Sequence, residues 1–516
     1  DQKMNSTKTV RYFFAAFGLV TVLAHSSLGL EPPVLRLSME TEPMSMDWHA
    51  HRSAVDRFIL SFMMRGLLRY DTNSKPICDL CRKYSVSEDK KVYRFELNTD
   101  VPWSDGGRLD AKQFVDSFRR LLDPVNRFKA AEEFRVIQGA LQPDKKWDFK
   151  KLEVKAENAE RLEIKLAQPL AFFPDLLTSV AAFPIRKELL KDSTGVLHVR
   201  EAVLGPYQLA EWQKGKRIVI EGNSKYSAVR PVYRVEFLIG ARPVQVEKFK
   251  QGKIDILSSP TTEDLFNLSP RQMQVNSYWA TRFLTFNTKL KPSSDPSFRR
   301  SILYGLERDV LPSFLKNGER RATGAIPPGL SGYRELPLVT MDLTHAQAER
   351  HRAVPWPKVV ELKILPRNTA TEVLVGQWLL EQLEKIKIHA KLQIKDDRSY
   401  FNDLESGKFE AVLMTAGFNI ANPTDWLRTF TTQAASNRLG WAHVAYDRLV
   451  EQIGGDTHAI DFEKHLDQAT QLLEVQEAVV IPLGYPTLPF LLGPRVQRFI
   501  VTPFGDPDLV NIELKR

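Results

Sequence analysis

The chain has 516 residues, of which 43% are hydrophobic and 26% are charged, and it contains only 2 cysteines. This composition excludes a disordered chain, a collagen-like chain and a small scaffold held by disulfides, and the length predicts about three domains or two large ones. The formal net charge is +9, but the basic residues are dispersed, so we expect no nucleic-acid partner.

Residues 1–29 have the pattern of a secretory signal peptide. Lys8 and Arg11 precede an uncharged apolar run, Tyr12–Ala24, that is shorter than the roughly 20 residues needed to span a membrane. Small residues then lead to an expected cleavage site after Gly29. We therefore predict an exported, periplasmic protein, and we expect no lipid anchor because no cysteine lies near the cleavage site.

The next part of the chain predicts a strand, a helix and a cysteine pair. Val34–Met39 alternates like a strand, and Ser53–Leu68 has apolar residues at helical spacing. Cys78 and Cys81 form a C-x-x-C after a turn. For an exported protein we expect a local disulfide, because a redox site would need a helix start and zinc would need further ligands.

The segment up to residue 184 reads as strands with a helix between them. Phe114, Phe118, Leu121 and Leu122 share one face of a helix that Asp110 can cap. The expected elements are a strand at Tyr93–Leu97, a helix at Asp110–Leu122, paired strands at Leu152–Ala156 and Arg161–Leu166, and a helix at Pro169–Thr178.

Strands and helices then alternate, as in an α/β sheet. The first set is a hairpin at Gly205–Glu221, a strand at Arg234–Ile239, a helix at Arg242–Gly252 and a strand at Ile254–Leu257. The second set is a strand at Arg282–Asn287, a helix at Pro296–Arg308 and a further helix at Asp461–Gln476. Between these helices, Lys358–Leu365, Thr369–Ile386, His389–Ile394, Tyr400–Ser406 and Ala411–Thr415 predict a doubly wound β-α-β-α-β unit.

Over residues 34–504 the sequence resembles the periplasmic oligopeptide- and dipeptide-binding proteins, the large solute-binding components of ABC importers. The stretch Tyr93–Pro124 is the most specific part of the resemblance, because it matches the family's signature from strand to helix. The other stretches that carry it are Glu42–His49 with Met64–Asp71, Gly205–Tyr226 with Phe249–Leu257, and Phe283–Asp309.

The resemblance implies an α/β fold of the periplasmic binding protein type, with two α/β lobes, hinge crossings and an inserted α+β domain in the first lobe. The expected bounds are 30–70, 185–280 and 487–516 for lobe one, 71–184 for the inserted domain and 281–486 for lobe two. The crossings are expected near Trp279–Asn287 and Ile481–Phe490. The resemblance also implies a monomer, a peptide ligand, ABC permease subunits in the inner membrane as partners, no cofactor and no enzymatic activity.

The best candidate for ligand contact is the stretch Gly417–Trp426, directly after a predicted buried strand. In peptide-binding relatives an aromatic residue and then an aspartate, which pairs with the ligand ammonium, stand shortly before a proline. Phe418 matches the aromatic residue, but Asn419 stands at the position of the aspartate and supplies no net charge. Asp425 is a possible substitute; otherwise the ligand lacks a free amino terminus or is not a simple peptide, or Asn419 merely forms a turn.

Further candidates fall into several groups. Aromatic side chains offer sequence-tolerant contact surfaces, although each could equally pack in a core. Arginines could pair with a ligand carboxylate. The expected ligand contacts are Glu42, Pro43, Met44, Trp279, Asn287, Phe418, Asn419, Asp425, Trp426, Trp441 and Tyr485, with Phe283, Arg428 and Arg438 as weaker candidates.

Two alternatives to a simple peptide receptor remain. His49 and His51 form an H-x-H that could share a metal, or could lie in a solvated loop, so a metal chelate, haem or a modified cell-wall peptide is an alternative ligand. A secreted hydrolase is a remote alternative, because the sequence has no G-x-S-x-G, H-E-x-x-H or P-loop motif.

Overall fold

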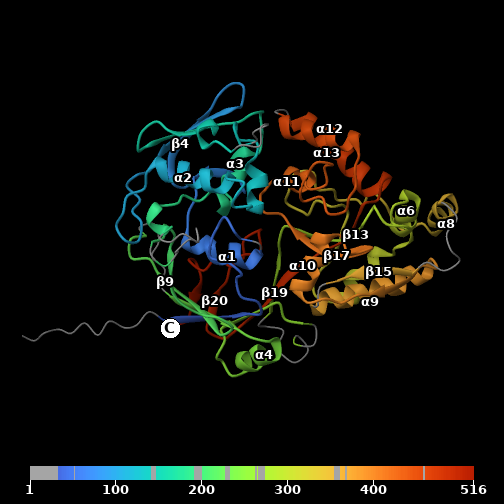
Figure 1. The fold of residues 1–516 in the computed structure, drawn as a ribbon. Helices are drawn as coiled ribbons and strands as arrows, with labels where there is room; N and C mark the ends of the chain where they lie inside the picture. The colour runs from blue at the N-terminus through green and yellow to red at the C-terminus, as the bar shows by residue number, and fades with distance from the viewer. Residues whose placement is uncertain are drawn as a thin grey trace, which may run out of the picture.

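The computed structural model describes residues 33–51, 53–140, 147–190, 200, 202–226, 233–261, 264, 273–353, 361–366, 369–456 and 459–515. The predicted signal peptide lies outside these described residues. Within them, no helix is long and apolar enough to cross a membrane. Two large sheets and a smaller one organise the molecule (Figure 1).

A seven-stranded sheet forms the first lobe. Its central strand, β1 (Val34–Met39), pairs in parallel with β10 (Arg234–Ile239) on one side and β11 (Ile256–Ser258) on the other. The remaining strands are β9 (Arg217–Gly222) and β8 (Tyr207–Gln213) beyond β10, and β19 (Thr487–Leu492) and β12 (Met273–Ser277) beyond β11. Helices α1 (Ala54–Met63) and α4 (Arg242–Lys250) belong to this lobe.

A four-stranded antiparallel sheet is inserted between β1 and β8 in the sequence. Its strands are β4 (Cys81–Val86), β5 (Val92–Leu97), β7 (Arg161–Lys165) and β6 (Val154–Ala156). Helix α2 (Ala111–Leu122) covers it and begins as predicted, since the Asp110 side chain accepts a hydrogen bond from the Gln113 N–H at 3.2 Å.

One predicted helix in this region is mostly wrong. Only α3 (Phe173–Leu176) is helical within the expected range Pro169–Thr178. The Thr178 hydroxyl donates to the Asp175 carbonyl at 2.7 Å, and the Ser179 hydroxyl accepts from the Ala181 N–H at 3.3 Å. These side chains compete with the helix for its backbone groups and end it early.

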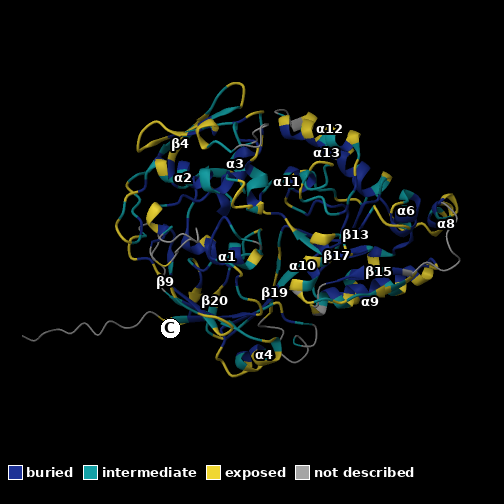
Figure 2. Cartoon of the chain, in the orientation of Figure 1, coloured by how far each residue is buried: buried dark blue, intermediate teal, exposed yellow. Residues whose placement is uncertain are grey.

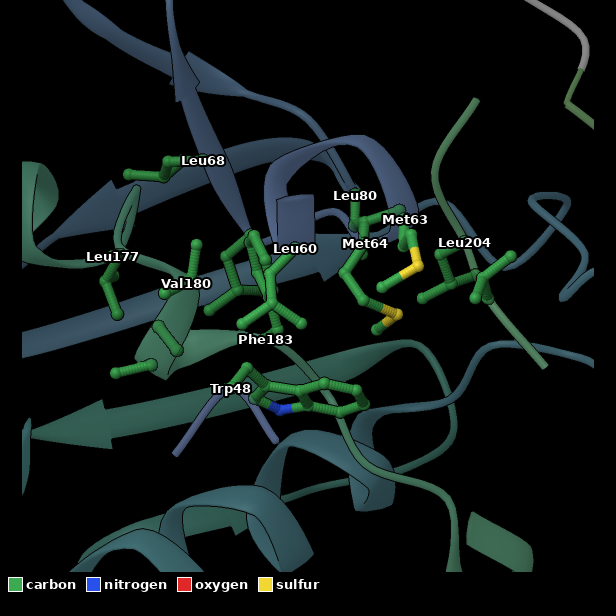
Figure 3. Packing of buried hydrophobic residues seen from close by; sticks show 14 of the residues in the cluster. Trp48, Leu60, Met63, Met64, Leu68, Leu80, Leu177, Val180, Phe183 and Leu204 are labelled. Carbon is green, nitrogen blue, oxygen red and sulfur yellow. The ribbon is translucent and has the colours of Figure 1, made fainter. Parts of the chain in front are cut away.

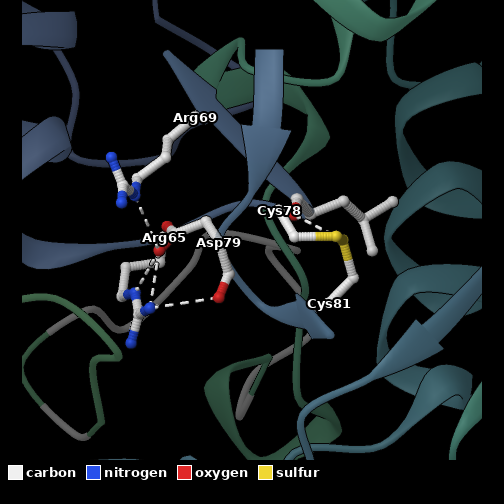
Figure 4. The surroundings of a disulfide bond; sticks show 6 residues. Arg65, Arg69, Cys78, Asp79 and Cys81 are labelled. Atoms are coloured by element: carbon white, nitrogen blue, oxygen red, sulfur yellow. Dashed lines mark hydrogen bonds and ion pairs between the residues drawn. A yellow bond between two sulfur atoms is a disulfide. The ribbon is translucent and has the colours of Figure 1, made fainter. Parts of the chain in front are cut away.

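The predicted local disulfide is present. It joins Cys78, at the end of β3 (Pro76–Cys78), to Cys81, at the start of β4, just after the short pairing of β3 with β2 (Leu68–Tyr70) (Figure 4). Asp79, between the two cysteines, accepts from the Arg65 guanidinium at 2.5 Å and 3.0 Å. The disulfide and this ion pair together fix the turn that leads into the inserted sheet.

A six-stranded sheet forms the second lobe, at the right in Figure 1. Its strand order is β14 (Arg320–Arg321), β18 (Val480–Tyr485), β13 (Ala280–Phe286), β17 (Ala411–Gly417), β15 (Glu361–Leu365) and β16 (His389–Leu392). Strand β15 is parallel to both β16 and β17, and α9 (Ala370–Lys385) and α10 (Asp397–Ser406) connect them. The predicted doubly wound unit is thus confirmed, apart from residues 358–360, which lie outside the described residues.

Two pairs of consecutive strands belong to different large sheets. The chain leaves the seven-stranded sheet after β12 and enters the six-stranded sheet at β13, and it returns between β18 and β19. Tyr278, Trp279 and Pro486 are the residues between these strands. This arrangement confirms the predicted two-lobe fold with hinge crossings, while the exact domain bounds stay a prediction.

Buried hydrophobic residues form three large clusters and a small one within the described residues. Figure 2 shows buried segments inside both lobes, with exposed ones at the periphery. Trp48, Leu60 and Phe183 belong to the same cluster, so the first lobe and the inserted domain share a continuous core (Figure 3). The second lobe has one cluster that includes Trp279, Phe418 and Trp426, and another that includes α9. We infer that the inserted domain moves with the first lobe when the lobes move.

Candidate functional site

The residues that follow β17 form a strip whose exposure alternates. We call residues 417–430 the docking strip. Gly417 and Asn419 are exposed, whereas Phe418 and Ile420 are buried. Because successive side chains of an extended backbone point to opposite sides, Phe418 and Ile420 anchor the strip and Gly417 and Asn419 face outward.

The outward side of the docking strip faces the first lobe. The Arg57 guanidinium of α1 donates to the Asn419 side-chain carbonyl at 2.6 Å. The Tyr70 hydroxyl accepts from the Ala421 N–H at 2.8 Å and donates to the Asp175 carboxylate at 3.0 Å. The contacts of Asn419 and Ala421 join segments more than 300 residues apart in the sequence, and no local sequence signal marks Arg57 or Tyr70 as part of the site.

Arg57 makes this end of the strip electropositive. Its Nη2 lies 3.9 Å from the Asp506 carboxylate, which is its nearest ion-pair partner among the described residues. Burial raises the pKa of Asp506, and Arg57 opposes that shift. A cation therefore occupies the place where an ammonium would have to approach Asn419, which argues against Asn419 as an ammonium receptor.

The aromatic candidates of the second lobe are packed in its core. Trp426 stacks on Phe283 with ring centroids 5.3 Å apart and an interplanar angle of 16°, and it also contacts Phe418 at 5.7 Å. Trp441 packs edge-on against Tyr446 at 4.9 Å. All the predicted aromatic contacts are buried, so these side chains shape the site from behind.

Tyr485 and Trp279 lie where the chain crosses between lobes. The Tyr485 hydroxyl bonds to the Thr323 hydroxyl at 2.9 Å and donates to the Gly324 carbonyl at 3.1 Å. Both aromatic residues line a cavity of about 240 Å³, together with Tyr278, Arg320 and Pro486. This volume is below the range of about 300–1,000 Å³ that holds a whole drug-sized ligand, so the cavity suits at most one end group of a ligand.

Helix α11 (Pro423–Arg428), within the docking strip, carries polar atoms that are buried without a partner. The Thr424 hydroxyl and the Arg428 Nη1 are buried and form no hydrogen bond with the described part of the chain. These residues are one helical turn apart and share a face. The Arg428 guanidinium lies 5.9 Å from the Phe172 ring of the inserted domain, so this face is turned toward that domain.

Two carboxyl groups meet Arg428 at the same interface. Burial raises the pKa of Asp425, and burial together with the charge of Asp425 raises the pKa of Glu133, while Arg428 lowers both. Glu133 belongs to the 3-10 helix Lys129–Phe134 of the inserted domain. Asp425 therefore lies near an acid of the inserted domain, and its role as a ligand contact stays a prediction.

The predicted contacts near the amino terminus are held within the first lobe. We call residues 42–51 the N-terminal loop. The Glu42 carboxylate accepts from the Trp212 indole N–H at 2.9 Å and from the Gly215 N–H at 3.2 Å. Pro43 is buried, and Met44 is 70% exposed with its N–H donated to Asp56 at 2.7 Å.

The two histidines of the N-terminal loop do not form a metal pair. His49 is fully buried, with its Nε2 3.1 Å from the Ser117 hydroxyl and its Nδ1 2.9 Å from Arg120. The His51 Nδ1 lies 2.6 Å from the Trp48 carbonyl. Burial lowers the pKa of His49 well below its ordinary value. The expectation of a solvated loop is wrong, and the described residues contain no group of three or more potential metal ligands.

Within the described part of the chain, two polar candidates have their side-chain contacts outside the docking strip. The Asn287 amide donates to the Gly407 carbonyl at 3.0 Å and accepts from the Lys289 N–H at 3.1 Å. Asn287 follows β13 at the end opposite Ala280, which pairs with Gly417, so about 20 Å separates Asn287 from Gly417 at some 3.3 Å per residue. Arg438 lies 3.9 Å from Glu405. None of these contacts is with a residue of the docking strip.

Comparisons with known proteins agree with this architecture. The family model described as bacterial extracellular solute-binding proteins, family 5 Middle, matches residues 75–438. The dipeptide-binding protein DppE of Bacillus subtilis is 23% identical over 92% of this chain and 91% of its own length. The periplasmic oligopeptide-binding protein OppA of Escherichia coli is 23% identical over 88% of each chain.

Solved structures show the same fold. Haemophilus influenzae OppA in complex with the peptide RPPGFSPFR has a TM-score of 0.82 at 19% identity, over 94% of this chain and 99% of that one. The Escherichia coli murein tripeptide binding protein MppA also has a TM-score of 0.82, at 21% identity, with the same coverage. At this level of identity the likeness concerns the arrangement of lobes and sheets.

Proposed function

Because the chain belongs to family 5 of the bacterial extracellular solute-binding proteins, we propose that it is a receptor that captures peptides between its two lobes and delivers them to an ABC permease. It acts as a periplasmic monomer, holds its ligand without altering it chemically, and meets the permease subunits at the inner membrane. The relatives named for dipeptide and oligopeptide binding support this assignment.

The observation that carries the proposal is the open edge of β17. Strand β13 pairs with β17 along residues 411–417, but β15 pairs only with Ala411 and Val412 on the other side. On that side, residues 413–417 pair with no strand in the described part of the chain, and this edge leads directly into the exposed part of the docking strip. An extended peptide can bind to such an edge through backbone hydrogen bonds, which all peptides can form regardless of sequence.

The hinge geometry supplies the second requirement. The lobes are joined by the crossings at Tyr278–Trp279 and Pro486, while Arg57 and Tyr70 touch the docking strip from the opposite lobe. A ligand on the open edge is enclosed when the lobes close, and its affinity comes from contacts made in the closed state.

Native mass spectrometry of freshly purified protein tests the proposal. We expect a heterogeneous ladder of peptide masses, whereas one discrete non-peptide mass would overturn the peptide assignment. Gly417→Phe should abolish the ladder, because a side chain there would stand on the open edge. Gly455→Phe is the matched control, since Gly455 is also exposed and a β-carbon there meets no atom within 4 Å.

One observation favours a ligand without a free amino terminus at Asn419, such as a modified cell-wall peptide. Arg57 donates to Asn419 and is suited to a ligand carbonyl or carboxylate, not to an ammonium. The histidines that suggested a metal chelate or haem are hydrogen-bonded to Ser117 of the inserted domain and to the Trp48 carbonyl, and they no longer support that alternative. Comparing the retention of a synthetic peptide with that of its N-acetylated form separates these ligands.

A further inference from the structure

Behind the open edge of β17 lies a buried group of charges, Arg282 on β13 with Glu319 and Glu372. Arg282 pairs with both oxygens of Glu319, at 2.9 Å and 3.0 Å, and with Glu372 Oε1 at 2.6 Å. The three residues are 3–6% exposed. Within this group, two carboxylates and one guanidinium leave one negative charge in excess.

The excess charge is centred on Glu372. Its Oε1 accepts from Arg282 and from the Thr415 hydroxyl, the latter at 2.8 Å, but its Oε2 is buried and has no partner among the described residues. Burying part of a carboxylate without a hydrogen bond or counter-charge is costly, and native structures rarely do so without a functional reason. The start of helix α9, where Glu372 lies, offsets only part of this charge.

The position of Glu372 connects this charge to the proposed ligand path. Thr415, which its carboxylate contacts, lies on the part of β17 whose edge is open. Arg320 is the one charged residue in the wall of the neighbouring cavity, and it makes no ion pair with any of the three residues. Glu372 is thus an acid close to the docking edge that lacks one cationic partner.

We propose that Glu372 receives a cationic group of the ligand, an ammonium or guanidinium, which completes the charge balance when the lobes close. This rests on the proposed function in that the ligand is a peptide, and the cationic group comes either from its amino terminus or from a basic side chain. Glu372 would then determine specificity at this end of the site, while Arg57 disfavours an ammonium at Asn419.

Four forms of a synthetic tri- to pentapeptide pool test this proposal: each peptide carries lysine or its neutral isostere norleucine, and a free or acetylated amino terminus. Wild-type protein should retain a cationic form over its neutral counterpart by roughly tenfold or more, the usual effect of a hydrogen bond to a charged group. A preference for lysine over norleucine identifies a basic side chain as the source of the cation, and a preference for the free over the acetylated form identifies the amino terminus. Glu372→Gln, which keeps an acceptor for Arg282 and Thr415, should lose this preference. The matched control Glu307→Gln, at a carboxylate that pairs with Lys385 at 3.2 Å outside the proposed site, should keep it.

The outcomes separate this inference from the proposed function. Equal retention of cationic and neutral peptides by the wild type, or an unchanged preference in Glu372→Gln, overturns the inference and leaves peptide binding intact. If no peptide is retained, the proposed function fails. The inference about Glu372 is then tested by measuring the melting temperature with propylammonium as the only added ligand. Propylammonium should raise the melting temperature of the wild type and of Glu307→Gln but not of Glu372→Gln; the absence of any rise in the wild type overturns the inference.

Discussion

The N-terminal loop and the docking strip differ in how completely the protein satisfies their polar groups. In the loop, Glu42, His49 and His51 all have partners in the first lobe or the inserted domain, and only the indole Nε1 of Trp48 is buried without one among the described residues. In the strip, the Thr424 hydroxyl and the charged Arg428, through its Nη1, both have a buried atom without a partner in the described part of the chain. Because folded proteins pair nearly all their buried polar groups, neighbouring unpaired ones that include a charged group suggest a surface that completes its bonds with a ligand. We therefore propose the strip, and not the loop, as the part that binds.

The largest expected effect comes from a variant that removes an ion-pair partner of the N-terminal loop. Arg120 donates to both carboxylate oxygens of Asp47, at 3.0 Å and 2.5 Å, and both side chains are almost buried. Arg120→Ala leaves Asp47 charged and alone, so we expect a loss of roughly 3–5 kcal/mol in unfolding free energy, measured by denaturant titration. The exposed pair of Arg82 and Asp100 is the control, where Arg82→Ala should cost about 1 kcal/mol or less.

Trp426→Ala tests the buried half of the docking strip. Removing an indole that stacks on Phe283 in the core should cost about 3–5 kcal/mol, with Trp426→Phe losing less. Trp426 is also one of the ligand contacts expected from the sequence, and from that role alone we would expect Trp426→Ala to lose binding but not folding. A cooperative unfolding curve with an unchanged midpoint for Trp426→Ala would favour that earlier expectation.

Glu133→Gln tests the charges beside the docking strip through the pH dependence of the unfolding free energy. The pKa of Glu133 is raised in the folded protein. Above the ordinary glutamate pKa of about 4.3, the unfolded chain therefore loses the proton of Glu133 while the folded protein still keeps it. Stability should therefore fall as the pH rises from that value toward the raised pKa. Glu133→Gln removes this decline, so it should be more stable than the wild type by on the order of 1 kcal/mol at pH 7.5, with the difference shrinking at pH 4.5.

Asn419→Asp gives the smallest expected effect and probes the contact between lobes. It places a carboxylate where Arg57 now donates to an amide, and a half-exposed ion pair of this kind adds about 0.2–1 kcal/mol. A double-mutant cycle with Arg57→Gln isolates that coupling. The same variant should also improve retention of peptides with a free amino terminus, and unchanged peptide selectivity would show that ligand does not reach Asn419.

Much of the fold follows from local sequence patterns. The alternation of Val34–Met39 and the β-α-β-α-β order up to Ala411–Gly417 reflect burial of one face or of a whole strand, which a single stretch of sequence records. The short helix α11 and strands β18 and β19 are not predicted. Strands buried on both faces near prolines, as in Val480–Tyr485, give neither the alternation nor the helical spacing that marks an element.

The site is less predictable than the fold for a physical reason. Its backbone edge and Asp425 lie in the stretch that the sequence marks out, but Arg57, Tyr70 and Glu133 reach it from remote elements. Whether His49 is solvated or buried depends on Ser117 and Arg120 of the inserted domain. Residue type reveals what a side chain can bond to, and only the tertiary structure reveals whether that partner is already present.

Strand β19 has a consequence for the order in which the molecule assembles. It pairs with both β11 and β12, so residues 487–492 complete a sheet that begins at residue 34. A chain that emerges from its amino terminus therefore holds an incomplete first lobe until the second lobe has been made. Pairings this distant in sequence fold slowly and leave strand edges exposed in the meantime. The connection that gives the receptor its hinge thus also makes the first lobe the last to be finished.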